Sequence, residues 1–175
     1  MSKLVISDEF SHMGGREFIF QRYPQLAKEI KEVITTTVIL SKSKVSREKT
    51  RKGRLVWSGK DFNTPLKKAF KDAGWQKEKI DLEHGSVEVD FYKEKVAVEV
   101  QFGKYSFVDT DFMKFEIFHY KGKVDAAVEI LPSRSLRSGM YTGPPDFDQV
   151  IARIKARGRN TPAVPLWIIG IDCVS

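Results

Sequence analysis

The sequence predicts an α/β protein built on a central mixed β-sheet flanked by helices. Three observations predict this class. Short strands interleave with amphipathic helices along the chain, two Val-rich strands form a hairpin within residues 87–107, and residues 164–171 form an apolar run suited to a buried strand. At 175 residues, the chain is expected to be a single domain, 1–175, with one substantial core.

Helical patterns and short β-branched runs alternate through the first half of the chain. Pro24 interrupts the first helical pattern, so the helix proper is expected to begin near it. Gly74 ends the second helical pattern. The elements expected here are a helix at 16–35, a strand at 36–40, a basic polar loop at 41–53, a strand at 54–57 and a helix at 61–73.

The second half continues the alternation after the hairpin. Pro132 ends a strand, and Gly158 closes a helix. Residues 133–145 are rich in Ser, Gly, Arg and Pro, which predicts a loop. The remaining expected elements are a helix at 110–120 with an aromatic face, a strand at 123–131, a helix at 147–156 and a strand at 164–171.

The hairpin carries the candidate chemistry. Side chains alternate between the two faces of a strand, so the apolar residues of both strands are expected on one buried face. These residues are Val87, Val89, Phe91, Val96, Val98 and Val100. The opposite face then gathers Glu88, Asp90, Glu99 and Gln101 within cross-strand reach.

Carboxylates on one face repel each other unless a cation lies between them, and Mg²⁺ prefers oxygen ligands. The pattern is therefore typical of a magnesium site. A solvated polar face on an amphipathic hairpin would give the same pattern. An unpaired Glu on a Val-rich, central strand would nevertheless be costly, which favours the magnesium site.

The hairpin also lies within a longer string that resembles a known family. Residues 98–107 read VEVQFGKYSF, and Asp90 and Phe91 precede them. The string resembles type II restriction endonucleases of the BglII/BstYI kind, within the PD-(D/E)xK nuclease superfamily. Similar segments follow one another in the same order over nearly the whole chain, at residues 10–12, 47–50, 73–75, 128–132, 162–166 and 169–171. The resemblance implies a restriction-endonuclease-like core that agrees with the predicted sheet.

The resemblance also implies roles for the hairpin residues. It places Asp90 at the first acidic position and Glu99 at the second, both as metal ligands, with the Val100 backbone carbonyl as a third oxygen ligand. Gln101 stands where the wider superfamily has Lys, and BglII-like enzymes share this departure. An amide cannot act as a general base, but it can hydrogen-bond the attacking water or the scissile phosphate. Asp90, Glu99 and Gln101 are therefore the catalytic candidates.

Two other carboxylates are weaker candidates for the site. Glu78 falls near the place from which relatives supply a further upstream ligand, and Glu88 shares the face of the hairpin motif. A structural role is the preferred interpretation for both. The three histidines lack partners at zinc-ligand spacing, so a zinc site is not expected.

Several segments are candidates for contact with DNA. The loop at 133–143 resembles the family region that enters the major groove, where an Arg can read guanine. The basic segment at 41–53 suits phosphate contacts, although a solvated loop explains any single residue of it. The candidate residues are Lys104, Tyr105, Ser106, Arg134, Arg137, Ser138, Met140, Lys49 and Arg51.

Composition agrees with a polyanionic partner. The net charge is +7 and the isoelectric point is near 9.4. The single cysteine, Cys173, forms no internal disulfide, and the first residues lack the apolar core of a signal peptide, so a cytoplasmic location is expected. No run is long and apolar enough to predict a membrane span.

The sequence thus predicts a Mg²⁺-dependent type II restriction endonuclease acting on double-stranded DNA. The resemblance implies a short palindromic target with a GATC core, cut to leave 5′ overhangs. Two-fold targets match two-fold protein symmetry, so a homodimer is expected, with the helix at 110–120 and parts of the N-terminal helix as candidates for its interface. Two alternatives remain: a repair or junction-resolving nuclease on the same scaffold, and a catalytically silent DNA-binding protein.

Overall fold

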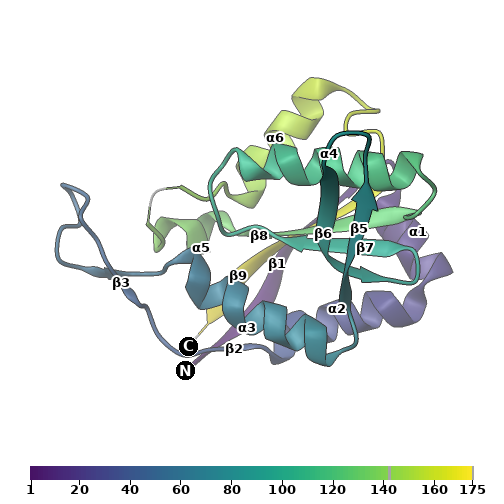
Figure 1. Ribbon diagram of the computed structural model, residues 1–175. Coiled ribbons are helices and arrows are strands. Elements are labelled where there is room, and N and C mark those ends of the chain that lie inside the picture. Colours follow the sequence, from purple (N-terminus) through teal and green to yellow (C-terminus); the bar gives the residue numbers. More distant parts are fainter. Residues whose placement is uncertain (142, 175) are drawn as a thin grey trace.

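The computed structural model describes residues 1–141 and 143–174. Helices and strands alternate along the chain, as Figure 1 shows. Their order is β1 (Ser2–His12), α1 (Gly15–Arg22), α2 (Pro24–Thr36), β2 (Val38–Ile39), β3 (Lys44–Val45), β4 (Leu55–Val56), α3 (Gly59–Asp72), β5 (Gln76–Asp81), β6 (Ser86–Lys93), β7 (Val96–Val100), α4 (Phe107–Tyr120), β8 (Ala126–Pro132), α5 (Arg134–Ser138), α6 (Phe147–Arg157) and β9 (Leu166–Val174).

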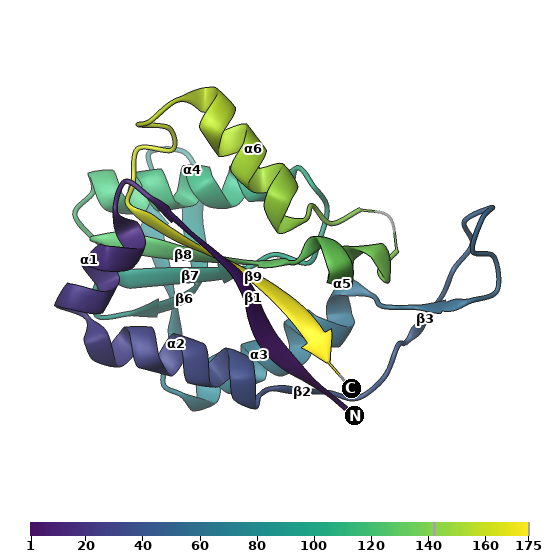
Figure 2. The ribbon, with the colours of Figure 1, turned by 180° about the vertical axis from the view of Figure 1, so that it is seen from behind.

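The central sheet is mixed and has the strand order β2-β1-β9-β8-β7-β6-β5. The pairs β7–β8 and β8–β9 are parallel, and the other neighbours are antiparallel. Helices α2 and α3 cover one face, and α4 and α6 cover the other (Figures 1 and 2). The predicted α/β class with a helix-flanked mixed sheet is confirmed.

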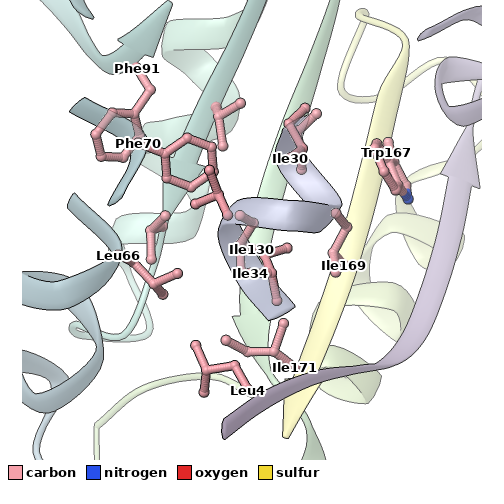
Figure 3. Close-up of a cluster of buried hydrophobic side chains, with 14 of the residues drawn as sticks. Leu4, Ile30, Ile34, Leu66, Phe70, Phe91, Ile130, Trp167, Ile169 and Ile171 are labelled. Carbon is pink, nitrogen blue, oxygen red and sulfur yellow. The ribbon is translucent and has the colours of Figure 1, made fainter. Parts of the chain in front are cut away.

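Each face of the sheet has its own apolar core. On the α2 and α3 side, Ile30 and Leu66 pack with strand residues such as Ile130 and Ile169, as Figure 3 shows. On the other side, Phe112, Phe115 and Phe118 of α4 cover the sheet together with residues of α6. Complete burial of one such side chain stabilises the fold by about 1.5–3 kcal/mol.

Most expected elements are present, with shifted ends. The break at Pro24 is confirmed, because α1 ends at Arg22 and α2 begins at Pro24. The long first strand β1, the edge strand β5 and the short helix α5 within residues 133–145 were not expected. Ser133 caps α5 by accepting a hydrogen bond from the Leu136 amide, which explains why a helix forms there. Within the described residues, no helix could cross a membrane.

The predicted basic loop is a projecting hairpin. Strands β3 and β4 pair in an antiparallel ladder, so residues 41–57 form an extended arm that leaves the body of the protein beside α5 (Figure 1). We call residues 41–57 the arm. Most of its charged side chains are exposed.

The hairpin β6–β7 departs from simple alternation. Between Val89 and Tyr92, strand β6 contains one more residue than β5 does opposite it, which is a β-bulge. Val89 therefore packs in the α4 core, whereas Phe91 packs in the α3 core. The expectation that Val87, Val89 and Phe91 share one face is wrong, because the bulge shifts the alternation by one residue.

Candidate active site

Four acidic or amide side chains are buried where the ends of β7 and β8 meet α4. Strand β7 supplies Glu99 and, directly after its end, Gln101, which are 4% and 9% exposed. Strand β8 supplies Glu129, which is 0% exposed and lies beside Glu99 in the parallel ladder. Helix α4 supplies Asp111, which is 3% exposed. We call Glu99, Gln101, Asp111 and Glu129 the acidic cluster.

Lys114 on α4 supplies a positive charge to this cluster. Its Nζ lies 3.0 Å from Glu99 Oε1 and 2.9 Å from Asp111 Oδ1. Burial alone would lower the pKa of Lys114, but the Glu99 and Asp111 carboxylates reverse this and raise the pKa. Lys114 therefore stays protonated and bridges β7 to α4.

Gln101 is held at both ends of its amide. Its Nε2 donates to Asp111 Oδ2 at 2.5 Å, and its Oε1 accepts from the Gly103 amide at 2.9 Å. A Cβ at Gly103 would lie 2.7 Å from Gln101 Oε1, so glycine is required for this close approach. Within the described part of the chain, one N–H and one lone pair of the Gln101 amide remain available to a further partner.

The cluster holds more carboxylate than its cation compensates. Both oxygens of Glu129 are buried and have no hydrogen-bond partner among the described residues. Burial raises the pKa of Glu129 well above its ordinary value, with Asp111 and Glu99 adding to the effect. Burial and the Asp111 charge raise the pKa of Glu99 to about 7, and burial also raises the pKa of Asp111. An additional positive charge would stabilise the ionised cluster.

Asp90 lies at the bulge, next to the acidic cluster. The β6–β7 ladder ends at Phe91 and Val98, and beyond it the Asp90 amide donates to Glu99 Oε1 at 3.2 Å. The Asp90 carboxylate instead pairs with Lys67 of α3, with Oδ2 2.7 Å from Nζ. It borders a hollow of about 430 Å³ lined by Lys67, Lys71, Trp75, Gln76, Lys77 and Phe91. The bulge thus interrupts the expected alternation at Asp90, where the backbone amide bonds to Glu99 and the carboxylate pairs with α3.

The weaker acidic candidates lie apart from the cluster. Glu88 is exposed and forms an ion pair with Lys77. Glu78 lies on the edge strand β5, opposite Val89. Among the described residues, neither carboxylate is in hydrogen-bond contact with Asp90 or Glu99.

The chemistry of the donor set fits a divalent cation. Four carboxyl groups, those of Asp90, Glu99, Asp111 and Glu129, lie near two lysines, and the Glu129 oxygens have no hydrogen-bond partner among the described residues. In the described part of the chain, no three His, Cys, Asp or Glu side chains are arranged to hold a metal ion. Asp90 and Glu99 would both have to leave their lysine partners to share one cation.

The DNA-contact candidates divide into exposed and engaged side chains. Lys49, Lys104, Tyr105, Ser106, Arg134 and Ser138 are exposed. Arg137 donates through Nε to the Pro144 carbonyl at 2.7 Å, and Arg51 is also engaged within the protein. Met140 is 0% exposed and packs in the α3 core, so the prediction that it contacts DNA is corrected. The Met140 backbone forms a parallel β-bridge with Trp57.

Sequence reasoning missed three residues of the site: Asp111, Lys114 and Glu129. Asp111 and Lys114 are one turn apart on α4, on the face that meets β7. Nothing in the helical pattern distinguishes them from solvated charges. Glu129 did give a signal, because it is the one charged residue of the otherwise apolar strand β8. A carboxylate in a buried parallel strand needs a partner or a function.

The fold is similar to that of solved restriction endonucleases. The crystal structure of restriction endonuclease BglII complexed with a DNA 16-mer matches with a TM-score of 0.76 and 22% sequence identity, over 96% of this chain and 77% of that chain. The crystal structure of free BglII matches with a TM-score of 0.68 and 20% identity, over 96% of this chain and 78% of that chain. This protein therefore has a restriction-endonuclease fold.

The sequence itself establishes the family. The family model described as restriction endonuclease BglII/BglIII matches residues 7–171, which is most of the chain. The chain belongs to this restriction endonuclease family, and it is a type II site-specific deoxyribonuclease. A comparison with curated proteins found no significant match.

Proposed function

We propose that this endonuclease is Mg²⁺-dependent and cuts double-stranded DNA at a short palindrome with a GATC core, leaving 5′ overhangs. The observation that carries the metal requirement is the uncompensated acidic cluster beside Asp90. The target core and the overhang rest on the family resemblance alone. The projecting basic arm and the exposed residues after β7 support contact with a polyanion.

Asp90, Glu99 and the Val100 carbonyl are the groups that would hold the cation. When bound, Mg²⁺ supplies a Lewis acid and a more acidic water. The protein's own groups would set the geometry around it. Asp111 fixes the Gln101 amide, whose free N–H and lone pair would orient the attacking water or the scissile phosphate.

We also propose that the enzyme acts as a homodimer, with one active site for each strand of the palindrome. The aromatic face of α4 is already used in the core, because Phe112, Phe115 and Phe118 are buried. The part of α4 left for a partner would be its exposed side, which carries Met113 at 47% exposure and Tyr120 at 87%.

Digestion of DNA of known sequence tests the proposal directly. With Mg²⁺ we expect discrete fragments whose sequenced ends share one palindrome and a 5′ extension. A chelator should abolish cutting. Cleavage that follows DNA junctions or damage instead of sequence would indicate a structure-specific nuclease and overturn the proposed target. Size-exclusion chromatography with light scattering should give twice the 20.0 kDa chain mass.

A further inference from the structure

Arg51 of the arm is held by protein groups at all three of its guanidinium nitrogens. Its Nε and Nη2 donate to Glu48 Oε2 at 2.9 and 2.6 Å, and its Nη1 donates to the Ser138 carbonyl at 2.8 Å. The Arg51 side chain is 24% exposed. Three of its five N–H donors are thus bonded to two protein groups, and Glu48 offsets its charge. A free phosphate contact would need neither arrangement.

Ser138 is the last residue of α5, which is only five residues long. The final carbonyls of a helix have no partner within the helix, and the helix dipole places partial negative charge on them. An arginine that donates to such a carbonyl satisfies it and neutralises that charge. Arg51 therefore caps the C-terminus of α5 from a segment 87 residues away in the chain.

The base of the arm is joined to the same stretch by the backbone. The Trp57 amide donates to the Gly139 carbonyl at 3.0 Å, and the Tyr141 amide donates to the Trp57 carbonyl at 3.1 Å. The Lys44 ammonium lies 3.5 Å from the centre of the Tyr141 ring. Figures 1 and 2 show the arm leaving the body beside α5. Residues 138–141 are thus held by the arm at both its tip and its base.

The stretch is linked on its other side to the catalytic strand. The Tyr105 amide, four residues after Gln101, donates to the Gly143 carbonyl at 2.8 Å. At the start of α3, Gly59 approaches Phe102 so closely that a Cβ would lie 2.3 Å from the Phe102 carbonyl oxygen. The arm, residues 133–143 and the turn after β7 therefore form one connected unit, with Thr142 outside the described residues.

We propose that Arg51 is a positioning residue for DNA recognition, which sets the end of α5 and thereby the placement of residues 133–143 against base edges. The inference rests on the proposed role of residues 133–143 in base readout. Base readout needs groups held within about 0.5 Å, whereas phosphate attraction tolerates looser placement. The arm therefore contributes to sequence discrimination through Arg51, and to general affinity through exposed cations such as Lys49.

Three variants separate these roles: Arg51→Ala, the charge-conserving Arg51→Lys, and Lys49→Ala as the matched control from the same hairpin. Affinity is measured for a duplex that contains the site cut by the wild-type enzyme, and for the same duplex with one base pair of that site changed, in Ca²⁺ at several salt concentrations. Lys49→Ala should weaken both complexes by the same factor and lower the salt slope by about one. Arg51→Ala should narrow the ratio of the two affinities about tenfold, the scale of one lost base contact.

Arg51→Lys is the decisive variant. Lysine keeps the charge but lacks the planar guanidinium that reaches Glu48 and Ser138 together. The ratio of the affinities for the two duplexes should therefore remain smaller than in the wild type, as in Arg51→Ala. A full return of discrimination in Arg51→Lys, or an Arg51→Ala variant that loses affinity uniformly as Lys49→Ala does, would overturn the proposal. If Arg51→Ala does not fold, Arg51→Lys carries the test.

Amide hydrogen exchange on the DNA-free protein tests the bond from Arg51 to the Ser138 carbonyl, here called the tether, independently of any DNA target. The Gly139 and Met140 amides, bonded to the Leu136 and Arg137 carbonyls, should exchange faster in both Arg51 variants than in wild type or Lys49→Ala. Unchanged exchange would refute the tether. If instead the wild-type protein fails to distinguish the two duplexes while the exchange result holds, it is the proposed function that fails and not the tether.

Discussion

The acidic cluster and the arm both consist of polar and charged side chains, but those of the cluster are buried and most charged side chains of the arm are exposed. Glu99, Asp111 and Glu129 are almost completely buried, carry more charge than Lys114 offsets, and have raised pKa values. The charged residues of the arm are mostly exposed, and water solvates them. The acidic cluster therefore costs stability and gains a fixed geometry. The arm costs little, and its geometry is fixed where Arg51 bonds to α5 and Trp57 bonds to the residues that follow α5.

The largest effect is expected from removing a proposed metal ligand. Asp90→Asn or Glu99→Gln should lower the single-turnover cleavage rate by about 10³-fold, the scale of losing a main electrostatic contact in an active site. Specific binding in a gel shift should persist, because the arm and residues 133–143 are untouched. Near-normal cleavage by either purified variant would remove that residue from the proposed site.

The identity of the cation should separate binding from cutting. Ca²⁺ should support specific binding with little cleavage, since it takes more ligands in looser geometry than Mg²⁺. A gel shift and a digest run side by side with each ion check this. Binding and cutting that both ignore a chelator would rule out the metal mechanism.

A smaller effect on the cleavage rate is expected from Asp111, which contacts Gln101 and Lys114 but is not itself a proposed metal ligand. Asp111→Asn should slow cleavage by about 10–100-fold, because Asp111 fixes Gln101 and shares Lys114 with Glu99. Asp109→Asn is the matched control, since Asp109 lies on the same helix but pairs with Arg153 and Arg157. Equal losses in the two variants would show that α4 matters only as a packed helix.

The stability of the metal-free protein should depend on pH through the acidic cluster. The Glu99 pKa is about 7 when folded, against an ordinary value of 4.5, so the folded state retains a proton that the unfolded chain has released. The contribution of Glu99 to the free energy of unfolding is thus complete below about pH 4.5 and is lost as the pH rises through about 7. Thermal melts from pH 4.5 to 8 should show this fall, and Glu99→Gln should flatten it. A wild-type profile as flat as that of the variant would contradict the assignment.

The buried carboxyl group of Glu129 should also lower the free energy of unfolding. Replacing it by the apolar side chain of similar length, Glu129→Met, removes a buried carboxyl group that has no partner among the described residues. We expect the free energy of unfolding to rise by about 1–3 kcal/mol in denaturant titrations. A loss of stability would mean that Glu129 makes a compensating contact in solution.

The smallest effect is expected on the arm. Lys49→Ala should change the free energy of unfolding by less than about 0.5 kcal/mol, because its side chain is exposed. The same variant weakens DNA binding, so stability and affinity change independently there. A large loss of stability in a denaturant titration would show that the arm contributes to the folded core.

The sequence by itself determined the α/β class and the position of most elements. The alternating valines of β7, amphipathic periodicity and the break at Pro24 are local signals, and the structure follows them. The hairpin motif also led to Glu99 and Gln101 at the end of the interior strand β7. These features depend on neighbours a few residues apart, which is the range over which a sequence pattern carries information.

Only the tertiary structure decided how the site is assembled. The bulge in β6 placed Asp90 opposite Lys67, the parallel ladder set Glu129 beside Glu99, and α4 brought Lys114 to both β7 and Asp111. Likewise, contacts across 87 residues tied Arg51 to Ser138. Strand register and helix docking are set by packing over the whole sheet, so no local pattern specifies which charges meet in the core.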